Sequence, residues 1–519
     1  MDKVGRVVSY LLLCFVFALF LTLFLSRESS DLSFLDDRII SLLKFTIFQA
    51  FLSTFFSIFI GVLLAWSLAH RSKFFGREML VALFSSSLVL PTLVVVFGLI
   101  SIYGRNGWIN TLAHSTWGDG FDSYLYGLFG IVLAHVYLNA SYASRSLLHA
   151  FESIPIERYK LSKSLGFNSL KQFFYVEFSA IKSTIIGISS IIFLLCFTSF
   201  AVVLILGGSP SYNTLEVAIY EAVRLDFDID LALKLSFLQL SISTVLVILS
   251  SSLTSKVSNL TQKSTIFWSE GAYIKFFQWF FIIVFALFFI TPLFSIVIDG
   301  YKADFSKIFS DKVFIKSFIT SITLALISAV LTLVFSILLS DAKRRAKSKF
   351  SQTLIGVSSN LYLAIPSLVL GLGFFLLSLR FPLSENTWAI IALLFANVLM
   401  ALPFSISIIS PLMIKTAKRY DRLSSSLGLS GYSRWKNVEF PYLRSSLAYV
   451  FSLAFCFSLG DLGIIALFGN DGFTTLPWYL YSLMGSYRTI DASGVALILL
   501  VLVLSVFLLI PRVFKEKSS

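Results

Sequence analysis

The sequence predicts an all-α polytopic membrane protein of about 12 transmembrane helices, arranged as two parallel six-helix halves. Of the 519 residues, 57% are hydrophobic and only 13% are charged, so the chain has more apolar surface than a soluble protein of this length can bury. Apolar runs of 18 or more residues recur along the chain. A polar segment of the first half also occurs again in the second half, which indicates an internal duplication.

Twelve apolar spans are expected, six in each half. The first half has them near 7–26, 45–69, 79–103, 124–148, 181–206 and 231–254. The second half has them near 274–298, 313–340, 353–379, 387–413, 443–468 and 492–511. The first span lacks a small-residue cleavage site, so we expect a retained helix and not a cleaved signal peptide. The expected units are a first half (1–254), a cytoplasmic connector (255–273) and a second half (274–519).

The charges of the loops predict the orientation of these spans. If the N-terminus is cytoplasmic, the loops on that side hold 29 Lys/Arg and 10 Asp/Glu, and the loops on the other side hold 12 and 18. Basic residues collect on the cytoplasmic side of membrane proteins. We therefore expect a multi-pass protein of the bacterial cytoplasmic (inner) membrane with both termini in the cytoplasm. The net charge of +13 follows from these loops and does not indicate a nucleic-acid partner.

The duplicated segment lies in the longest cytoplasmic loop of each half, at 149–180 and 414–442. Lys160-Leu161-Ser162-Lys163-Ser164-Leu165-Gly166 returns 262 residues later as Arg422-Leu423-Ser424-Ser425-Ser426-Leu427-Gly428. Ten residues beyond each glycine the chain reads Val176-Glu177-Phe178 and Val438-Glu439-Phe440. A single such loop is most simply a solvated turn, but two copies with the same spacing favour a docking surface.

The apolar positions of both copies recur at helical spacing until the glycine interrupts them. Gly166 and Gly428 are expected to adopt a positive φ angle, which carries a steric cost for residues with a Cβ atom. The short helix before each glycine is expected to project from the membrane as a rigid peg.

This doubled pattern resembles the EAA loop of ABC importer permeases. The glycine of that motif maps onto Gly166 and Gly428, and its later proline maps onto Pro441 and, in the first half, onto Ser179. The leading Glu-Ala-Ala maps onto Lys160-Leu161-Ser162 and Arg422-Leu423-Ser424, so the acidic residue of the motif is absent from both halves.

The resemblance implies a type I ABC importer permease with several partners. Two copies of a cytoplasmic ATP-binding subunit would dock on the two loops, and a periplasmic substrate-binding protein would deliver the cargo. The chain contains no G-x-x-x-x-G-K-[ST] phosphate loop, so ATP and Mg are expected in the partner ATPase, with no cofactor and no catalytic residue here. The expected coupling residues are Lys160, Leu161, Ser162, Ser164, Leu165, Gly166, Glu177, Arg422, Leu423, Ser424, Ser426, Leu427, Gly428 and Glu439.

Fused two-half permeases of this length include a ferric-ion type and a thiamine type. Three segments, at 95–108, 133–148 and 466–488, are similar to the permease of the bacterial thiamine and thiamine pyrophosphate importer. The resemblance implies import of thiamine and its phosphates, with ferric ion as the alternative cargo. A secondary transporter is less favoured, because many such carriers use inverted repeats and these repeats are parallel.

Three polar residues inside apolar spans are candidates for the substrate pathway. Asp461 either supplies a counter-charge to the cationic thiazolium ring or satisfies backbone and hydroxyl groups between helices. His135 and Asn139 are expected mainly to form interhelical hydrogen bonds. Cys14, Cys196 and Cys456 all lie in apolar segments, and no metal-ligand spacing is present, so no metal site is expected.

Overall fold

A computed structural model describes residues 2–25, 36–117, 124–253, 271–346, 348–360, 365–470 and 472–514. Within these ranges the chain is helical, and the pairing of Asn470 with Phe473 is an isolated β-bridge. This confirms the all-α prediction. Most of the expected connector, up to residue 270, lies outside the described residues, and α13 begins directly after Gly271.

The two halves contain similar successions of helices, with differences such as α5 in the first half and α14 in the second. The first half contains α1 (Asp2–Leu25), α2 (Asp37–His70), α3 (Arg77–Ser86), α4 (Thr92–Tyr103), α5 (Trp108–Trp117), α6 (Leu128–Glu152), α7 (Ile156–Ser164), α8 (Ser169–Gln172), η1 (Phe173–Phe178), α9 (Ser179–Phe197), α10 (Ala201–Leu206), α11 (Leu215–Arg224) and α12 (Ile229–Leu253). The second half contains α13 (Ala272–Tyr301), α14 (Phe305–Ser310), α15 (Lys312–Arg345), α16 (Lys349–Ser359), α18 (Ser367–Arg380), α19 (Glu385–Ser426), α20 (Gly431–Arg434), η2 (Trp435–Glu439), α21 (Phe440–Gly460), α22 (Gly463–Phe468), α23 (Leu476–Gly485) and α24 (Thr489–Val513).

Ten helices in the described part of the chain are long and apolar enough to cross a membrane. The remaining two of the twelve expected spans correspond to α6 and to the pair α16 and α18. The pair is interrupted, so neither of its helices is long enough alone. Together these elements account for six spans in each half, and the chain is a multi-pass membrane protein.

The spans expected at 79–103 and 353–379 are each divided into two helices. The first span breaks between α3 and α4 at Pro91, and the second breaks between α16 and α18 at Pro366. Each proline is the residue directly before the second helix of its pair. Proline has no backbone N–H to donate and fixes its own φ, so it starts a helix readily and does not continue one.

Two further expected spans also divide near their outer ends. The span at 181–206 stops at Phe197 and resumes as α10, and the span at 443–468 stops at Gly460 and resumes as α22. The short outer helices α4, α10, α18 and α22 therefore all begin within the apolar region. Non-helical backbone at that depth is tolerated where protein or a cavity surrounds it.

The second long helix of each half forms the centre of its packing. Helix α2 packs along α6 and α9, and α15 packs along α19 and α21. A hydroxyl on each accepts a hydrogen bond from the first backbone N–H of an outer helix. Leu215 donates to Thr46 Oγ1 over 3.1 Å, and Leu476 donates to Ser321 Oγ over 2.8 Å. The duplication therefore extends to individual contacts.

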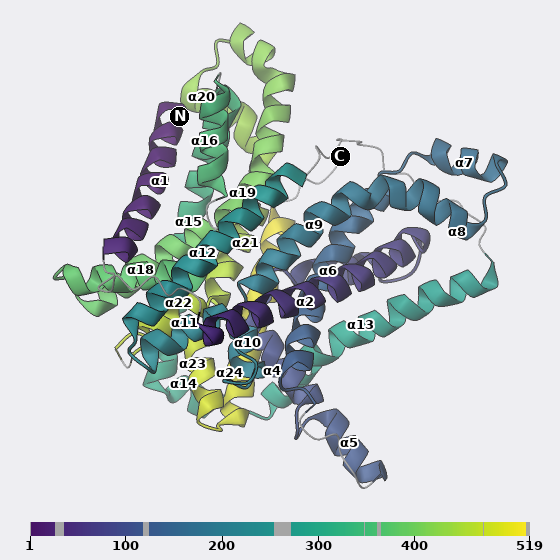
Figure 1. Cartoon of the computed structure of the whole chain (residues 1–519). Helices are drawn as coiled ribbons and strands as arrows, with labels where there is room; N and C mark the ends of the chain where they lie inside the picture. Colours follow the sequence, from purple (N-terminus) through teal and green to yellow (C-terminus); the bar gives the residue numbers. More distant parts are fainter. Residues whose placement is uncertain are drawn as a thin grey trace.

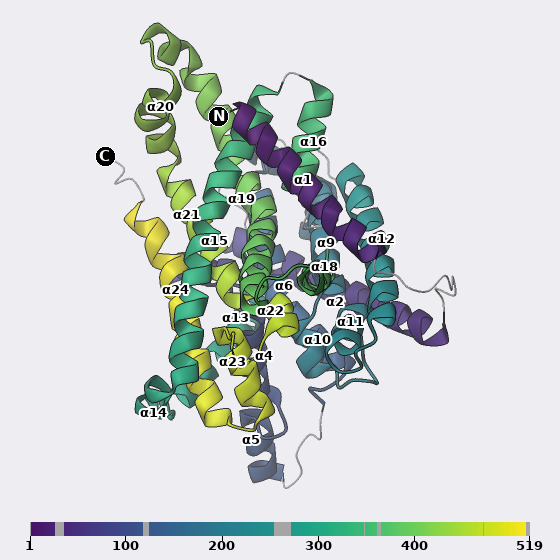
Figure 2. The same cartoon turned by 90° about the vertical axis from the view of Figure 1, so that its left-hand side faces the viewer.

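The repeated loops project from one end of the molecule. Figure 1 shows α7 and α8 at the upper right and α20 at the top, with α5, α14 and α23 at the opposite end. In the rotated view, α1 begins and α24 ends on the side of the loops (Figure 2). Both copies of the segment thus face the same side, as parallel halves require.

We predict that Gly61→Val destabilises the first half. The Cβ atom would lie 2.6 Å from Ala143 Cβ, in the contact between α2 and α6, and 3.3 Å from the carbonyl oxygen of Ala140. Overpacking of this kind costs about 1–3 kcal/mol. The thermal unfolding temperature of the purified protein should fall. Gly356→Val, at a helical position with nothing within 4 Å, is the matched control and should change it little.

Candidate functional site

Both repeated segments end a helix in the same way. Helix α7 ends before Gly166, where the N–H of Gly166 donates to Lys163 O and that of Phe167 donates to Ser162 O. Two bonds of the same pattern close the end of α19, with Gly428 in the place of Gly166. The φ angles are +67° at Gly166 and +65° at Gly428, which confirms the prediction of a left-handed turn.

The two pegs differ in how they begin. Helix α7 is a separate helix of nine residues that starts directly after Pro155. In the second half there is no such break, and the peg is the last part of the 42-residue helix α19. The expectation of a separate short helix in both halves is therefore correct only for the first.

Each peg presents two leucines to solvent. The exposed fractions are 60% for Leu161 and 62% for Leu165, and 54% for Leu423 and 64% for Leu427. Residues four apart lie on the same face of a helix, so each pair forms one apolar patch. Lys160, Ser164, Arg422 and Ser426 are also exposed, whereas Ser162 and Ser424 are buried.

Glu177, one of the expected coupling residues, is buried inside its loop. Its Oε1 atom is 3.2 Å from His70 Nε2, at the end of α2, and accepts a hydrogen bond of 3.1 Å from Gln172 Nε2. His70 Nδ1 is 2.9 Å from the carbonyl oxygen of Trp66, so both ring nitrogens face acceptors. Glu177 therefore fastens the first loop to α2.

Glu439 occupies the matching position in the second loop. Its Oε1 atom accepts from Arg344 NH1, on α15, and from Arg434 Nε, on α20, both over 3.1 Å. Arg344 also pairs with Asp341, and Arg434 also pairs with the exposed Asp421. Glu439 is buried and joins the second loop to α15.

Each of these glutamates lies in a π-helical segment, η1 or η2, that leads from the loop into the next long helix. Such segments are rare and frequently occur at functional sites. In the first loop the buried Tyr159 lies beside Glu177, and its burial together with the carboxylate charge raises the pKa of Tyr159 well above its usual value. The predicted coupling set thus divides into an exposed peg and a buried anchor.

A cavity of about 220 Å³ lies between the two halves, where the interrupted helices begin. Its lining includes Pro91 and Thr92 at the start of α4, Ser367 at the start of α18, and Gly463 at the start of α22. All three predicted pathway residues, Asp461, His135 and Asn139, line this cavity. The structure therefore brings together residues separated by more than 300 positions in the sequence.

Each pathway candidate is bonded to a polar group of the protein. His135 Nδ1 is 3.0 Å from Ser53 Oγ, Asn139 Nδ2 donates to Cys196 Sγ over 3.3 Å, and Asp461 Oδ1 accepts from the N–H of Gly463 over 3.1 Å. Among the described residues, His135 Nε2 and Asp461 Oδ2 are buried and have no partner. The interhelical hydrogen bonds expected of His135 and Asn139 are present.

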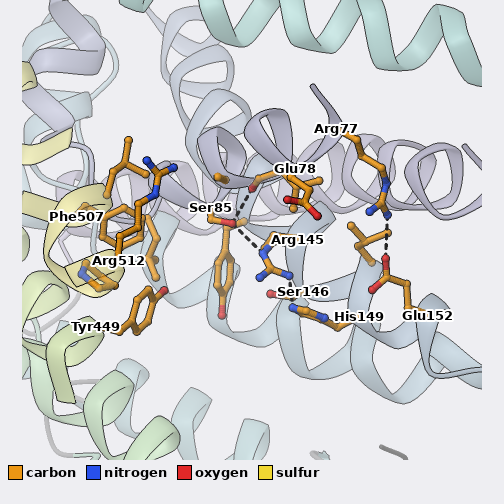
Figure 3. Close-up of a pocket in the computed structure, with 17 residues that line it drawn as sticks. Arg77, Glu78, Ser85, Arg145, Ser146, His149, Glu152, Tyr449, Phe507 and Arg512 are labelled. Atoms are coloured by element: carbon orange, nitrogen blue, oxygen red, sulfur yellow. Dashed lines mark hydrogen bonds and ion pairs between the residues drawn. The ribbon is translucent and has the colours of Figure 1, made fainter. Parts of the chain in front are cut away.

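A larger cavity of about 600 Å³ adjoins the first on the side of the repeated loops. Leu88 and Tyr142 line both cavities, so the two cavities lie next to each other. We call this larger cavity the vestibule. Figure 3 shows Arg145 in its middle beside Ser85 and His149, with Arg77 and Glu152 on one side and Tyr449, Phe507 and Arg512 on the other.

The sequence alone does not identify several residues of the cavities. Thr92 and Ser367 lie inside apolar spans and do not stand out there. The matched segments Leu90-Pro91-Thr92 and Ile365-Pro366-Ser367 do indicate two breaks. In the sequence, Arg145 is visible only as a charged residue near the end of an apolar span. Only the packing of α6 against α3 and the approach of α21 and α24 show that it lines a cavity.

Comparison with known proteins identifies the family. A model described as "Binding-protein-dependent transport system inner membrane component" matches residues 57–260 and 333–514. The thiamine transport system permease protein of Escherichia coli (strain K12) is 38% identical, over 92% of this chain and 89% of that protein. The corresponding protein of Salmonella typhimurium is 36% identical, over 98% and 96%, and that of Brucella abortus (strain 2308) is 37% identical, over 92% and 88%. The chain therefore belongs to the family of binding-protein-dependent transport system inner membrane components, the permeases of ABC importers.

Proposed function

We propose that this chain is the translocation subunit of an ABC importer that moves thiamine and its phosphates from the periplasm to the cytoplasm. The observation that carries the proposal is the similarity to thiamine transport permeases over nearly the whole chain. The two loops face the cytoplasm, as the positive-inside charge distribution favours, and both termini lie on the same side. A periplasmic binding protein delivers the cargo to the opposite face.

The energy comes from two copies of a separate ATPase subunit, which bind ATP and Mg. Each copy docks on one peg, with the leucine pairs Leu161/Leu165 and Leu423/Leu427 as its apolar contacts. When the ATPase dimer closes, the pegs approach each other and the two halves move as rigid bodies. The buried anchors Glu177 and Glu439 transmit this movement to α2 and α15. ATP binding drives the change because it favours one of the two states.

The central cavity is the stretch of the pathway in which the cargo crosses between the halves. Its volume of about 220 Å³ is below the range of about 300–1,000 Å³ that is usual for pockets that hold small organic ligands. The cavity must therefore widen when cargo passes, as expected for a pathway that opens to each side in turn. This chain supplies no catalytic group to the process.

Co-purification and uptake together test the proposal. A tagged chain should bring down an ATPase and a binding protein in a ratio of one permease to two ATPases to one binding protein. Proteoliposomes that contain the complex should import labelled thiamine on addition of ATP, with ferric ion as the control cargo. Isolation of a lone carrier driven by a proton gradient would contradict the proposal, and import of iron in place of thiamine would reassign the cargo.

We predict that Asp461→Asn separates the two roles considered for this residue. Asparagine keeps the acceptor that bonds the N–H of Gly463, but it removes the charge from the unpartnered Oδ2. If that charge balances the thiazolium ring, import of thiamine should fall at least tenfold while the complex still assembles. Asp461→Ala, which also removes the acceptor, is the comparison variant and should in addition weaken assembly. Normal uptake by the Asn variant would show that Asp461 is only structural.

A further inference from the structure

Arg145 projects into the vestibule. Its Nε atom donates to Ser85 Oγ over 2.8 Å, and its NH1 group contacts His149 Nε2. Among the described residues, no carboxylate forms an ion pair with it. The nearest acid by sequence, Glu152, pairs instead with Arg77 over 2.9 Å. A half-buried guanidinium group is thus held in position by Ser85 and His149, and the charge of Glu152 also acts on it.

The surroundings of Arg145 combine a cation with hydroxyl groups and aromatic rings. Tyr142 and Tyr449 line the vestibule together with Ser146 and Phe507. Figure 3 shows Ser146, Tyr449 and Phe507 around the same cavity as Arg145. A guanidinium group with free N–H donors binds the oxygens of a phosphate in a two-pronged geometry. Aromatic faces pack against flat rings and attract cationic ones. The site therefore suits a phosphate ester that carries an aromatic ring.

The vestibule lies on the course that cargo takes after the central cavity. Tyr142 lines both cavities and is one turn of α6 away from Arg145. Three arginines and two glutamates line the vestibule (Arg77, Arg145, Arg512, Glu78 and Glu152), so its formal charge is positive and would repel a thiazolium cation. The same charge attracts a cargo whose phosphate groups outweigh its ring charge.

We infer that Arg145 forms a phosphate subsite at the cytoplasmic end of the pathway, which receives the phosphate tail of phosphorylated thiamine while Tyr142 and Tyr449 contact its ring system. Ser85 acts as a positioning residue that orients the guanidinium group. This inference rests on the proposed function and adds to it a residue that distinguishes phosphorylated from free cargo. The head group of an anionic lipid shares the same phosphate chemistry, so the test must separate the two sources.

The test compares two cargoes in proteoliposomes that contain the complete complex. Arg145→Gln should lower import of thiamine pyrophosphate at least tenfold and leave import of free thiamine within twofold, which also shows that the variant folds and assembles. Arg145→Lys keeps the charge without the fork of donors and should recover part of the loss. Lys349→Gln removes an exposed cation at the start of α16, outside both cavities, and should leave both cargoes unaffected.

Vesicles made with and without anionic lipid separate cargo from head group. The inference requires the same selective loss in vesicles of neutral lipid alone, and a loss seen only with anionic lipid would overturn it. Equal loss for both cargoes, or no loss for either, would also overturn it and leave the proposed function intact. If the unmodified complex imports neither cargo, the proposed function itself fails and this inference fails with it.

Discussion

Replacement of the four peg leucines by aspartate is expected to abolish transport and to release the ATPase. Leu161, Leu165, Leu423 and Leu427 are each more than half exposed and make two apolar patches that nothing in the described part of the chain covers. Burial of a leucine in an interface contributes about 1.5–3 kcal/mol. Loss of two such side chains at each site, with charges in their place, should reduce ATPase affinity by several orders of magnitude. Co-purification and ATP-driven uptake measure the two effects.

The halves offer an internal comparison for this result. Substitution of one pair only, Leu161 and Leu165, should leave one ATPase copy attached and still stop transport, because both halves must be moved. Phe75→Asp is the control, since Phe75 is fully exposed in the turn between α2 and α3 but lies outside both pegs. Retention of the ATPase by the four-leucine variant would show that the subunit docks elsewhere.

Most of the fold can be predicted from the sequence, because helices that cross a membrane need an apolar composition. A span must be apolar over about 20 residues, so the helices are visible in the sequence as runs. The duplicated segment and the positive φ of its glycines were also predictable, because the glycine follows a helical pattern at the same distance in both halves. Hydropathy does not show the breaks after α3 and α16, because it does not distinguish one long helix from two short ones. Only Pro91 and Pro366, which precede the next helices, indicate them.

The candidate site is only partly readable from the sequence. Asp461, His135 and Asn139 stand out as polar residues in apolar spans, and they do line one cavity. That Glu177 and Glu439 are buried and pair with residues of α2 and α15 could not be foreseen. Their partners His70 and Arg344 lie about a hundred residues away on α2 and α15, and only the three-dimensional packing brings these pairs together.

The second large effect is expected from Glu439→Gln, which should separate ATP hydrolysis from transport. Glutamine has the same shape as glutamate but lacks the charge that holds Arg344 and Arg434 together. Both arginines are largely buried, with exposed side-chain fractions of 9% and 17%. Removal of one partner from a buried ion pair costs about 3–5 kcal/mol, because a charge is left uncompensated. Here Asp341 and Asp421 retain part of the compensation, so a smaller loss of about 1–3 kcal/mol is expected.

The lost interaction energy should weaken the contact between the loop and α15. It should not weaken ATPase docking, because the exposed face of the peg is unchanged. The complex should co-purify intact and hydrolyse ATP, and cargo import per ATP should fall about tenfold. Asp421→Asn is the matched control: it removes the exposed partner of the same Arg434 and should have little effect, since surface pairs contribute about 0–1 kcal/mol.

A double-mutant cycle with Arg344→Gln shows whether the two residues act as one link. If Glu439 works through Arg344, the double variant should lose little more than Glu439→Gln alone, since the second substitution removes a charge that the first left unpaired. Additive losses would mean that Glu439 acts through Arg434 within the loop. The contact with α15 would then not be the route by which the movement of the loop reaches the transmembrane helices.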